Sequence, residues 1–529
     1  MYFYRYDFDL AFQKSIGHLP YSVAIGNGDG VKGSSYFIGM KAPKQQPPLP
    51  SPSVLPSRIA DQQVLIDSLD LERVRPLLES LYSRTRGGRR PYDPVLMLRD
   101  MLWMHFADYA FNAWSREVRR NATLARCIGF TETTPAVSTR YSFCYRLLDG
   151  PPDGRPRLSS ASNHSRFLRN LAAEKQQRTA KKAQQADASE ALSTRLHRRL
   201  ASQLQAPLPD SFLGRVFALL GALAIEPSAQ RGLFDSNSDV AIDGSLVASQ
   251  ASSRGHRLPD GLQKTLQEEL QASARFYSDP TATWGYCASK DRYVFGYRLH
   301  AAIVVTPRHQ LPVALSIAPG HLSDIEMGMT DMAQLVQYQH HAGLDLHIQG
   351  VLADKGYDAC GFHRLIIAAG MDPLVPLRKI PHQDAEQIPR NEEGVPLCPA
   401  GLPMRYHGYN KRGHKHTYNC PVKRPTHKDG RYTMKSHPHE CPHGQLCEPD
   451  SKMGPVCHLR TKDNPRLNPR ILRDSDEFKE RFKQRSSAER FFSYVKGADD
   501  KRRYRRQHLV LLHALSKAIR LHAMAWQDG

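Results

Sequence analysis

Apolar residues recur at helical spacing from residue 57 to about residue 148. The longest amphipathic run extends from Leu96 through Met101 to Phe106, with apolar positions three to four residues apart. This spacing predicts a small helical domain at residues 61–150. Before it, residues 1–60 end in a proline-rich stretch that cannot continue a helix or a sheet, so we expect a poorly ordered leader.

Short apolar runs, typical of buried strands, replace the helical spacing beyond residue 236. Such runs predict strands at residues 240–243, 293–305, 312–320, 348–354 and 373–377. Helical spacing at residues 324–341 and 362–369 separates the last three strands. Three strands, a helix, a strand, a helix and a strand are typical of an α/β core with crossover connections.

The predicted core is interrupted along the chain. We place its first part at residues 236–380 and its last helices at residues 471–529, including one helix at about 475–496. The intervening residues 381–470 are rich in Pro, Gly, His and Cys, and they form a predicted Cys/His-rich insert. Residues 151–235 form a predicted basic, largely helical connector.

The charge of the chain indicates a polyanionic partner. The 529 residues carry a formal net charge of +21, which would attract DNA or RNA and make binding sensitive to salt. Residues 155–200 alone hold 11 Lys or Arg against 3 Asp or Glu. If residues 115–126 form one helix, four arginines share roughly one face, which could follow DNA phosphates or simply be solvated: Arg116, Arg119, Arg120 and Arg126.

Other classes of protein find little support in the composition. No run of 18 or more apolar residues indicates a membrane span, and the first residues lack the charged leader and apolar core of a secretion signal. We therefore expect an intracellular protein. The nine cysteines are an odd number, which argues against a disulfide framework in a reducing compartment.

Three carboxylates occupy positions that suit metal chemistry. Asp243 follows the apolar run 240–242, and Asp354 follows the run 351–353, so both are predicted to end strands. Distant residues can converge at such an edge of a sheet and hold a divalent metal. Glu489 is predicted on the last long helix. Taken singly, each of these residues is more often a turn former or a surface residue.

The segment around Glu489 carries a family resemblance. Phe482, Arg485, Glu489 and Lys496 have the spacing aromatic-x2-Arg-x3-Glu-x6-Lys, which resembles the signature on the last catalytic helix of DDE transposases from bacterial insertion sequences. That family usually has Tyr at the first position, so Phe482 keeps the ring and loses the hydroxyl. Residues 290–300, 319–324 and 352–358 also resemble segments of this family. Residues 91–99 and 138–147 resemble its helical amino-terminal domain more weakly.

The resemblance implies an RNase H-like fold with a mixed sheet and flanking helices. It also implies that Asp243, Asp354 and Glu489 bind Mg²⁺ or Mn²⁺, since hard oxygen ligands suit these ions. Five basic residues are expected to contact phosphate groups of DNA: Arg485, Lys496, Lys355, Arg502 and Arg503. Tyr357, Lys355 and His300 could line the same site, or they could have structural roles.

The insert raises a separate question about zinc. Thiolate and imidazole groups at short spacings can hold a structural Zn²⁺, and the best candidates are Cys398, Cys420, Cys441 and Cys447. No paired Cys-x2-Cys motif is present, so a metal-free basic insert that follows DNA is the alternative.

The sequence therefore predicts a transposase that binds the double-stranded DNA ends of its mobile element, nicks them with Mg²⁺ and joins the 3′-hydroxyls to target DNA. The resemblance implies a homodimer on DNA and a cytoplasmic, nucleoid-associated location in a bacterium. Two alternatives remain at this point: a metal-dependent nuclease of the same fold that never joins strands, and a DNA-binding protein with an inactive core.

Overall fold

The fold is that of a computed structural model of the chain. It describes residues 55–82, 91–148, 192–378 and 388–528, apart from gaps at 209–210, 235–236, 255, 258–274, 277–278, 280, 288–290, 307, 345, 429–430, 444–446, 448–450, 452 and 498–504. Most of the predicted leader and about half of the predicted connector lie outside these residues, as do Arg502 and Arg503.

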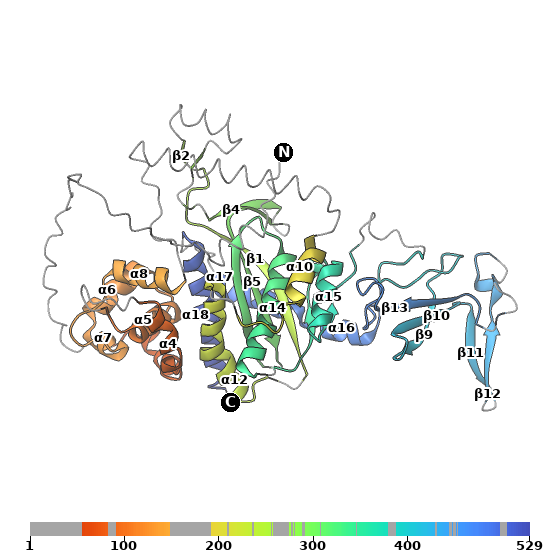
Figure 1. The fold of residues 1–529 in the computed structure, drawn as a ribbon, viewed down its shortest axis with the longest axis horizontal. Helices are drawn as coiled ribbons and strands as arrows, with labels where there is room; N and C mark the ends of the chain where they lie inside the picture. The colour runs from red at the N-terminus through yellow and green to blue at the C-terminus, as the bar shows by residue number, and fades with distance from the viewer. Residues whose placement is uncertain are drawn as a thin grey trace, which may run out of the picture.

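A mixed sheet forms the centre of the molecule (Figure 1). Its middle strand β1 (Ser238–Ala248) pairs antiparallel with β5 (Arg292–Val305) and parallel with β7 (Ile348–Leu352). The outer strands are β4 (Thr283–Cys287) and β6 (Gln310–Pro319), both antiparallel to β5, and β8 (Asp372–Leu374), parallel to β7. The predicted mixed α/β sheet is confirmed.

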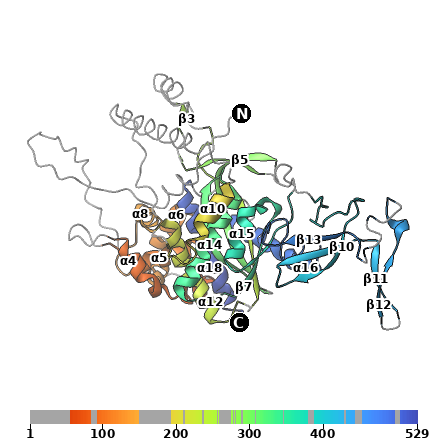
Figure 2. The same cartoon turned by 45° about the vertical axis from the view of Figure 1, so that its right-hand side comes forward.

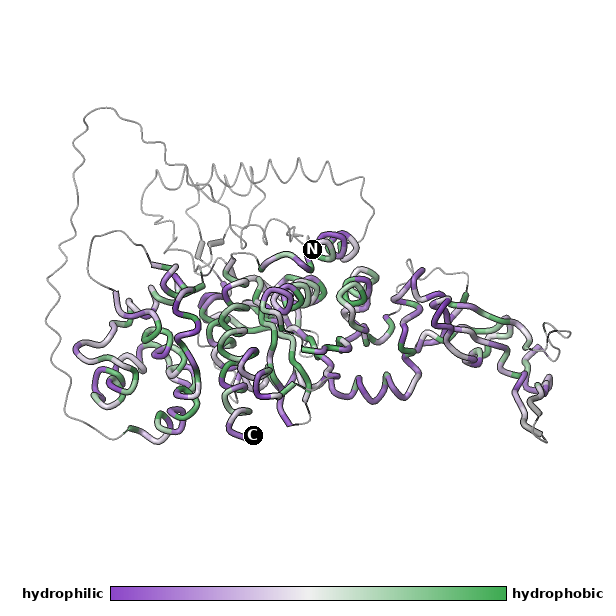
Figure 3. The backbone as a smooth tube through the Cα atoms, turned by 60° about the horizontal axis from the view of Figure 1, so that its bottom comes forward, coloured by the Kyte–Doolittle hydropathy of each residue, from purple (hydrophilic) through white to green (hydrophobic). Residues whose placement is uncertain are grey.

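Helices cover both faces of the sheet. Successive residues of β1 point to opposite faces, so each face of the sheet presents residues of this strand to the helices beside it. On one side, Gly328 of α14 (Asp324–Ala342) lies against Ile242 and His300. On the other side, α16 (Asp476–Phe482) and α17 (Ser486–Lys496) contact β1 through Arg481 and Lys496. Figure 3 shows the hydrophobic positions concentrated along the central strands and the helices beside them.

Further helices complete the core. Along the chain between the helical domain and the sheet come α10 (Leu192–Ala201), α11 (Phe212–Leu220), the π-helical turn η2 (Gly221–Ile225) and α12 (Glu226–Gln230). The segment Phe212–Gln230 is long and apolar enough to cross a membrane, but 72% of its most apolar window is buried inside the fold, as in a core helix. After β7 come η4 (Lys355–Tyr357) and α15 (Cys360–Ala368), and a two-residue pair joins β2 (His256–Arg257) to β3 (Arg275–Phe276).

The amino-terminal helices pack against the last helix of the chain, α18 (Gln507–Ala525), as Figures 1 and 2 show. Contacts between them include a hydrogen bond of 3.3 Å between His105 and His513 and an ion pair of 2.8 Å between Asp108 and Lys517. Their bounds are α2 (Ser57–Ala60), α3 (Gln63–Asp67), η1 (Leu71–Val74), α4 (Arg75–Ser80), α5 (Pro94–Phe106), α6 (Phe111–Arg120), α7 (Ala122–Ile128) and α8 (Val137–Leu147). The buried residues of both parts form one continuous core.

The insert extends away from the core at the right of Figure 1. It contains the three-stranded sheet β13–β10–β9 and, farther out, the hairpin β11–β12. The bounds are β9 (Arg405–Asn410), β10 (Lys415–Asn419), β11 (Lys423–Lys428), β12 (Arg431–Ser436), η5 (Pro438–Glu440) and β13 (Val456–Arg460). None of these strands was predicted, because their residues are mostly polar and lack regular alternation.

Three predictions about local structure are wrong. Asp243 does not end its strand, since β1 continues to Ala248. The helix predicted at 475–496 is broken by a 3₁₀ turn, η6 (Lys483–Arg485), between α16 and α17. Residues 115–126 are not one helix, because Asn121 is extended and its side chain accepts the Leu124 N–H at 2.9 Å, which starts α7; Arg126 therefore lies on a different helix from the other three arginines.

Candidate active site

The register of β1 and β7 brings Asp243 and Asp354 to the same level. In this parallel pair, Asp239 lies opposite Gly350 and Ala241 lies opposite Leu352. Two residues farther along each strand direction lie Asp243 and Asp354. Because side chains alternate along a strand, both aspartates lie on the face of the sheet that carries α16 and α17. The predicted convergence of these two residues therefore agrees with the strand pairing.

Two side-chain contacts align the helix of Glu489 with β1. Arg481 on α16 forms a two-pronged ion pair with Asp239, with nitrogen–oxygen distances of 2.6 and 2.8 Å. Lys496 at the end of α17 donates to Ser245 Oγ at 2.7 Å. Along the chain, Glu489 lies between Arg481 and Lys496, beyond the 3₁₀ turn η6, and Asp243 lies between Asp239 and Ser245 on β1. The two contacts therefore hold α17, which carries Glu489, beside the part of β1 that carries Asp243.

The side chain of Glu489 is paired with Arg485. Their spacing of four residues places them on one helical face, and Arg485 donates to Glu489 Oε1 at 2.5 Å. The side chain of Glu489 is 54% exposed and that of Arg485 is 24% exposed. Glu489 thus has solvent access while it is paired with Arg485.

Burial and nearby charges shape the chemistry of Asp243. Burial is the main cause that raises the pKa of Asp243 to about 6. The Gly244 N–H, which donates to Asp243 Oδ1 at 2.8 Å, and His300 lower this pKa, whereas the carboxylates of Asp324 and Asp354 raise it. The site thus gathers negative charge that a bound cation would stabilise.

Asp354 has a more open setting than Asp243. It is half-buried just beyond the end of β7, and its Oδ1 accepts the Gly356 N–H at 2.7 Å, which caps the turn η4. The neighbouring Lys355 is exposed. This cap is the turn-forming role that a strand-end aspartate often has, and it leaves the second carboxylate oxygen of Asp354 available to a ligand.

Asp324 and Arg298 are site residues that sequence reasoning did not single out. Arg298 on β5 pairs with Asp324 Oδ2 at 2.6 Å. The other oxygen of Asp324 is buried without a hydrogen-bond partner and lies toward Gly244, where an added Cβ would come within 1.9 Å of it. Residue 324 belongs to a segment that resembles the family, but its ion pair depends on the packing of α14 against β5.

Tyr357 and His300 lie beneath the site and do not line it. Tyr357 OH and His300 Nε2 are 2.8 Å apart, and His300 Nδ1 lies 2.7 Å from Asp331 Oδ2. Ser316 donates to the same Asp331 oxygen at 2.9 Å. All four side chains are buried. They therefore form a structural network that supports β1 and α14, which is one of the two roles that the sequence left open for Tyr357 and His300.

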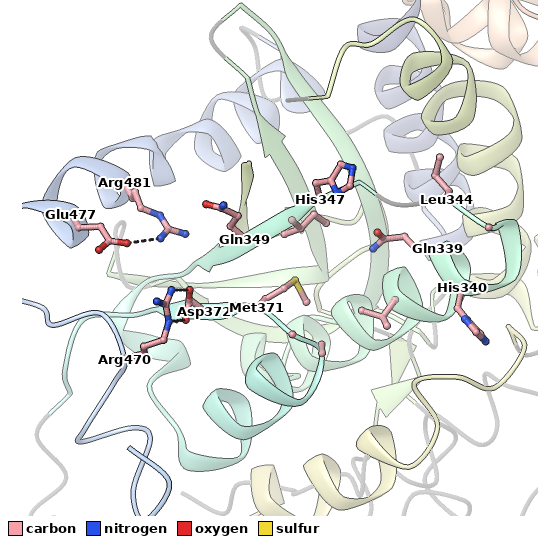
Figure 4. A pocket seen from close by; sticks show the side chains of 15 residues that line it. Gln339, His340, Leu344, His347, Gln349, Met371, Asp372, Arg470, Glu477 and Arg481 are labelled. Carbon is pink, nitrogen blue, oxygen red and sulfur yellow. Dashed lines mark hydrogen bonds and ion pairs between the residues drawn. The ribbon is translucent and has the colours of Figure 1, made fainter. Parts of the chain in front are cut away.

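A cavity of about 890 Å³ lies at the other end of β7 from Asp354 (Figure 4). Its lining includes Ile348, which begins that strand. Its charged side chains are already paired: Arg470 with Asp372, and Arg481 with Glu477 at 3.1 Å. This cavity is therefore separate from the carboxylates, and its charges already have partners.

Two sequence models of known families match the chain. The family described as Transposase DDE domain matches residues 238–521, which is more than half of the chain, and the family described as Transposase domain (DUF772) matches residues 60–146. No curated protein matches the chain.

The mixed sheet with its flanking helices, together with the match to the DDE domain, defines an RNase H-like fold. Among proteins with this fold, the chain belongs to the DDE transposase family of insertion sequences. The predicted resemblance and RNase H-like fold class are thereby confirmed. DNA is the substrate of this family, and its members use divalent metal, typically Mg²⁺.

Proposed function

We propose that this chain binds the double-stranded DNA ends of its mobile element, cleaves their strands with Mg²⁺ or Mn²⁺ and transfers the freed 3′-hydroxyls to target DNA. The observation that supports this proposal is that strand register puts Asp354 on the strand beside Asp243, while the contacts of Arg481 and Lys496 hold the helix of Glu489 against the same strand, β1.

Asp243, Asp354 and Glu489 would hold the metal. Their oxygens are the ligands that Mg²⁺ prefers. When bound, the metal would activate the attacking hydroxyl or water and stabilise the leaving oxygen. The chain itself would orient Glu489 through Arg485.

Basic side chains near the carboxylates would position the DNA. Lys496 brings its charge to Ser245, two residues beyond Asp243, and the exposed Lys355 adjoins Asp354. Arg485 would contact phosphate as well as Glu489. Arg502 and Arg503, in the basic segment after α17, are also proposed to contact phosphate; this part of the proposal rests on the sequence.

The proposal extends to the rest of the molecule. The helical domain at 61–150 and the connector at 151–235 would recognise the ends, while 236–380 and 471–529 would perform the chemistry around the insert 381–470. Pairing of two ends would require a homodimer on DNA, in the cytoplasm with the bacterial nucleoid.

An excision and integration assay tests this function. A marker flanked by the DNA on either side of the gene is offered to the wild-type protein, to Glu489→Gln and to Glu480→Gln. Glu480 is a matched control, because it lies on α16, is exposed and pairs only with Lys483 among the contacts described. We expect junctions with wild type and Glu480→Gln, and none with Glu489→Gln, which should still bind DNA.

Three outcomes would contradict the proposal. Cleavage without joining would identify a nuclease that does not transfer strands. Normal junctions with Glu489→Gln would remove Glu489 from the site. DNA binding without cleavage by the wild-type protein, in Mg²⁺ and in Mn²⁺, would identify an inactive DNA-binding protein.

A further inference from the structure

Four of the five cysteines in the insert line one small cavity. They are Cys398, Cys420, Cys441 and Cys447, and the remaining wall is formed by Ala400, Leu402, Pro421, Val422 and Pro455. The cavity measures about 10 Å³, the size that a single water molecule or ion takes. All four cysteines are free thiols.

The backbone holds three of these cysteines on turns. Cys398 begins a turn closed by the Gly401 N–H, which donates to the Cys398 carbonyl at 2.8 Å, and Gly401 has a φ of 78°. Cys420 directly follows β10, and Cys441 directly follows η5. These three side chains are buried and that of Cys447 is exposed. Thiols brought together by separate turns are typical of structural metal sites.

The fifth cysteine of the insert does not line this cavity. Cys457 on β13 pairs in register with Tyr418 and packs in an apolar cluster with Val395, Met404, Leu459 and Cys398. The structure therefore selects four ligand candidates from five and supplies Cys457 as a control in the same insert.

The apolar core around the four thiols is very small. Its buried members are Cys420, Val422 and Cys441, with Ala400 and Leu402 partly buried beside them. Such a core contributes little to folding, and small units of this kind are commonly held together by a metal.

We propose that Cys398, Cys420, Cys441 and Cys447 bind one structural Zn²⁺, and that this ion fixes the base of the hairpin β11–β12. Cys420 precedes β11 by three residues, and Cys441 follows β12 by five. A backbone hydrogen bond of 2.8 Å from His437 to Val422 closes the hairpin between them. The ion would join both ends of the hairpin to the turn of Cys398.

A rival site lies next to Cys441. In the part of the chain that the structure describes, His437, His439 and Glu440 are the one group of three or more His, Cys, Asp or Glu residues whose ligand atoms all lie within 4.8 Å of one another. The four thiols would therefore have to move closer together on binding. The rival group is mostly exposed, and Glu440 already pairs with Arg424.

The test measures zinc in the full-length protein, purified without chelator, by elemental analysis. We expect about one Zn²⁺ per chain in the wild type, in Cys457→Ser and in His439→Ala. Cys420→Ser and Cys447→Ser should lose most of it. Cys447 is exposed, so its replacement leaves packing intact even if Cys420→Ser does not fold. Replacement of Zn²⁺ by Co²⁺ should give the absorption of tetrahedral thiolate coordination.

A second measurement addresses the hairpin. Hydrogen exchange of β11 and β12 should become faster when zinc is removed, whereas exchange of β1 should not change. The proposal is overturned by a wild-type protein without zinc, by full zinc in Cys447→Ser, or by loss of zinc in His439→Ala. Unchanged exchange of the hairpin would overturn its attachment to the ion. None of these results depends on transposition, so they leave the proposed function untouched.

Discussion

Lys496 Nζ donates a hydrogen bond of 2.7 Å to Ser245 Oγ, which joins the end of α17 to β1 two residues beyond Asp243. The contact has two separable effects: it brings a positive charge near the carboxylates, and it attaches the helix to the strand by a hydrogen bond. The hydroxyl of Ser245 contributes only to the attachment, whereas the ammonium group of Lys496 contributes to both effects.

Replacement of each partner separates these effects. We expect Lys496→Gln to lower strand cleavage by roughly a hundredfold, the scale of losing one preorganised charge. Ser245→Ala keeps the charge and should lower cleavage far less. Single-turnover cleavage of an end substrate measures both variants. Equal losses of cleavage would show that the activity depends on the hydrogen bond between helix and strand, and not on the charge of Lys496.

Gly244 separates Asp243 from Asp324 and leaves no space for a side chain. A Cβ at this position would lie 1.9 Å from Asp324 Oδ1 and 3.5 Å from His300. We expect Gly244→Ala to displace Asp324 or β1 and to reduce metal-dependent cleavage strongly, while the fold persists. Gly343→Ala is a matched control for space, since no atom lies within 4 Å of its added Cβ, although its positive φ adds backbone strain. Wild-type cleavage by Gly244→Ala would show that Asp324 is free to move without consequence.

The sequence was a better guide to one aspartate than to the other. Asp354 follows an apolar run that ends with the strand, and the next residues form a turn, so its place was predictable. The apolar run before Asp243 ends at Ile242, yet β1 continues for six more residues because β5 is long enough to pair with it as far as Ala248. Asp243, Gly244 and Ser245 interrupt the apolar run before Leu246, Val247 and Ala248, so the sequence alone ends the strand too early.

Contacts between distant residues were beyond the sequence. The pairing of Arg298 with Asp324 and the network of His300, Asp331 and Tyr357 depend on how α14 packs on β5. The strands of the insert were also missed. Its two apolar clusters are small, so few positions along these strands are apolar and the sequence shows no clear alternation of apolar and polar residues. By contrast, the Arg485–Glu489 contact was predictable, because helical spacing alone places the two side chains together.

A buried ion pair supports the helical domain. Arg140 donates to both oxygens of Asp100, at 2.7 and 3.1 Å, and both side chains are fully buried. Trp114 Nε1 also donates to Asp100 at 2.7 Å. We expect Asp100→Ala to reduce the free energy of unfolding by about 3–5 kcal/mol, because it leaves the charge of Arg140 buried and unpaired.

Denaturant unfolding measures this loss, and a double variant provides its control. Asp100→Leu combined with Arg140→Met removes both charges and should recover much of the stability lost by Asp100→Ala. If the double variant is no more stable than Asp100→Ala, the cost comes from lost packing or from Trp114, and not from the stranded charge.

His522 makes the stability of the fold sensitive to acid. It is fully buried, its Nδ1 lies 2.8 Å from Ser228 Oγ, and its Nε2 donates to the Pro312 carbonyl at 2.9 Å. Trp526 Nε1 donates to the same serine oxygen at 2.8 Å, so that Ser228 donates its own proton to Nδ1 and the imidazole is neutral. Burial lowers the pKa of His522 from 6.5 to about 4, although the bond to Pro312 opposes this shift.

The sign follows from the unfolded chain, whose histidine takes up a proton below about pH 6.5. Since the folded state takes up that proton only near pH 4, the stability contributed by neutral His522 is complete above pH 6.5 and is lost as the pH falls from 6.5 to 4. The loss approaches about 3 kcal/mol, from the difference between the two pKa values.

Urea unfolding between pH 4 and pH 8 measures this loss of stability. His522→Gln, which does not titrate, should be less stable at pH 8 and should show a flatter pH dependence than wild type. His508, whose pKa burial also lowers to about 4, should keep part of the slope in that variant. An unchanged slope in His522→Gln would assign the acid sensitivity to other groups.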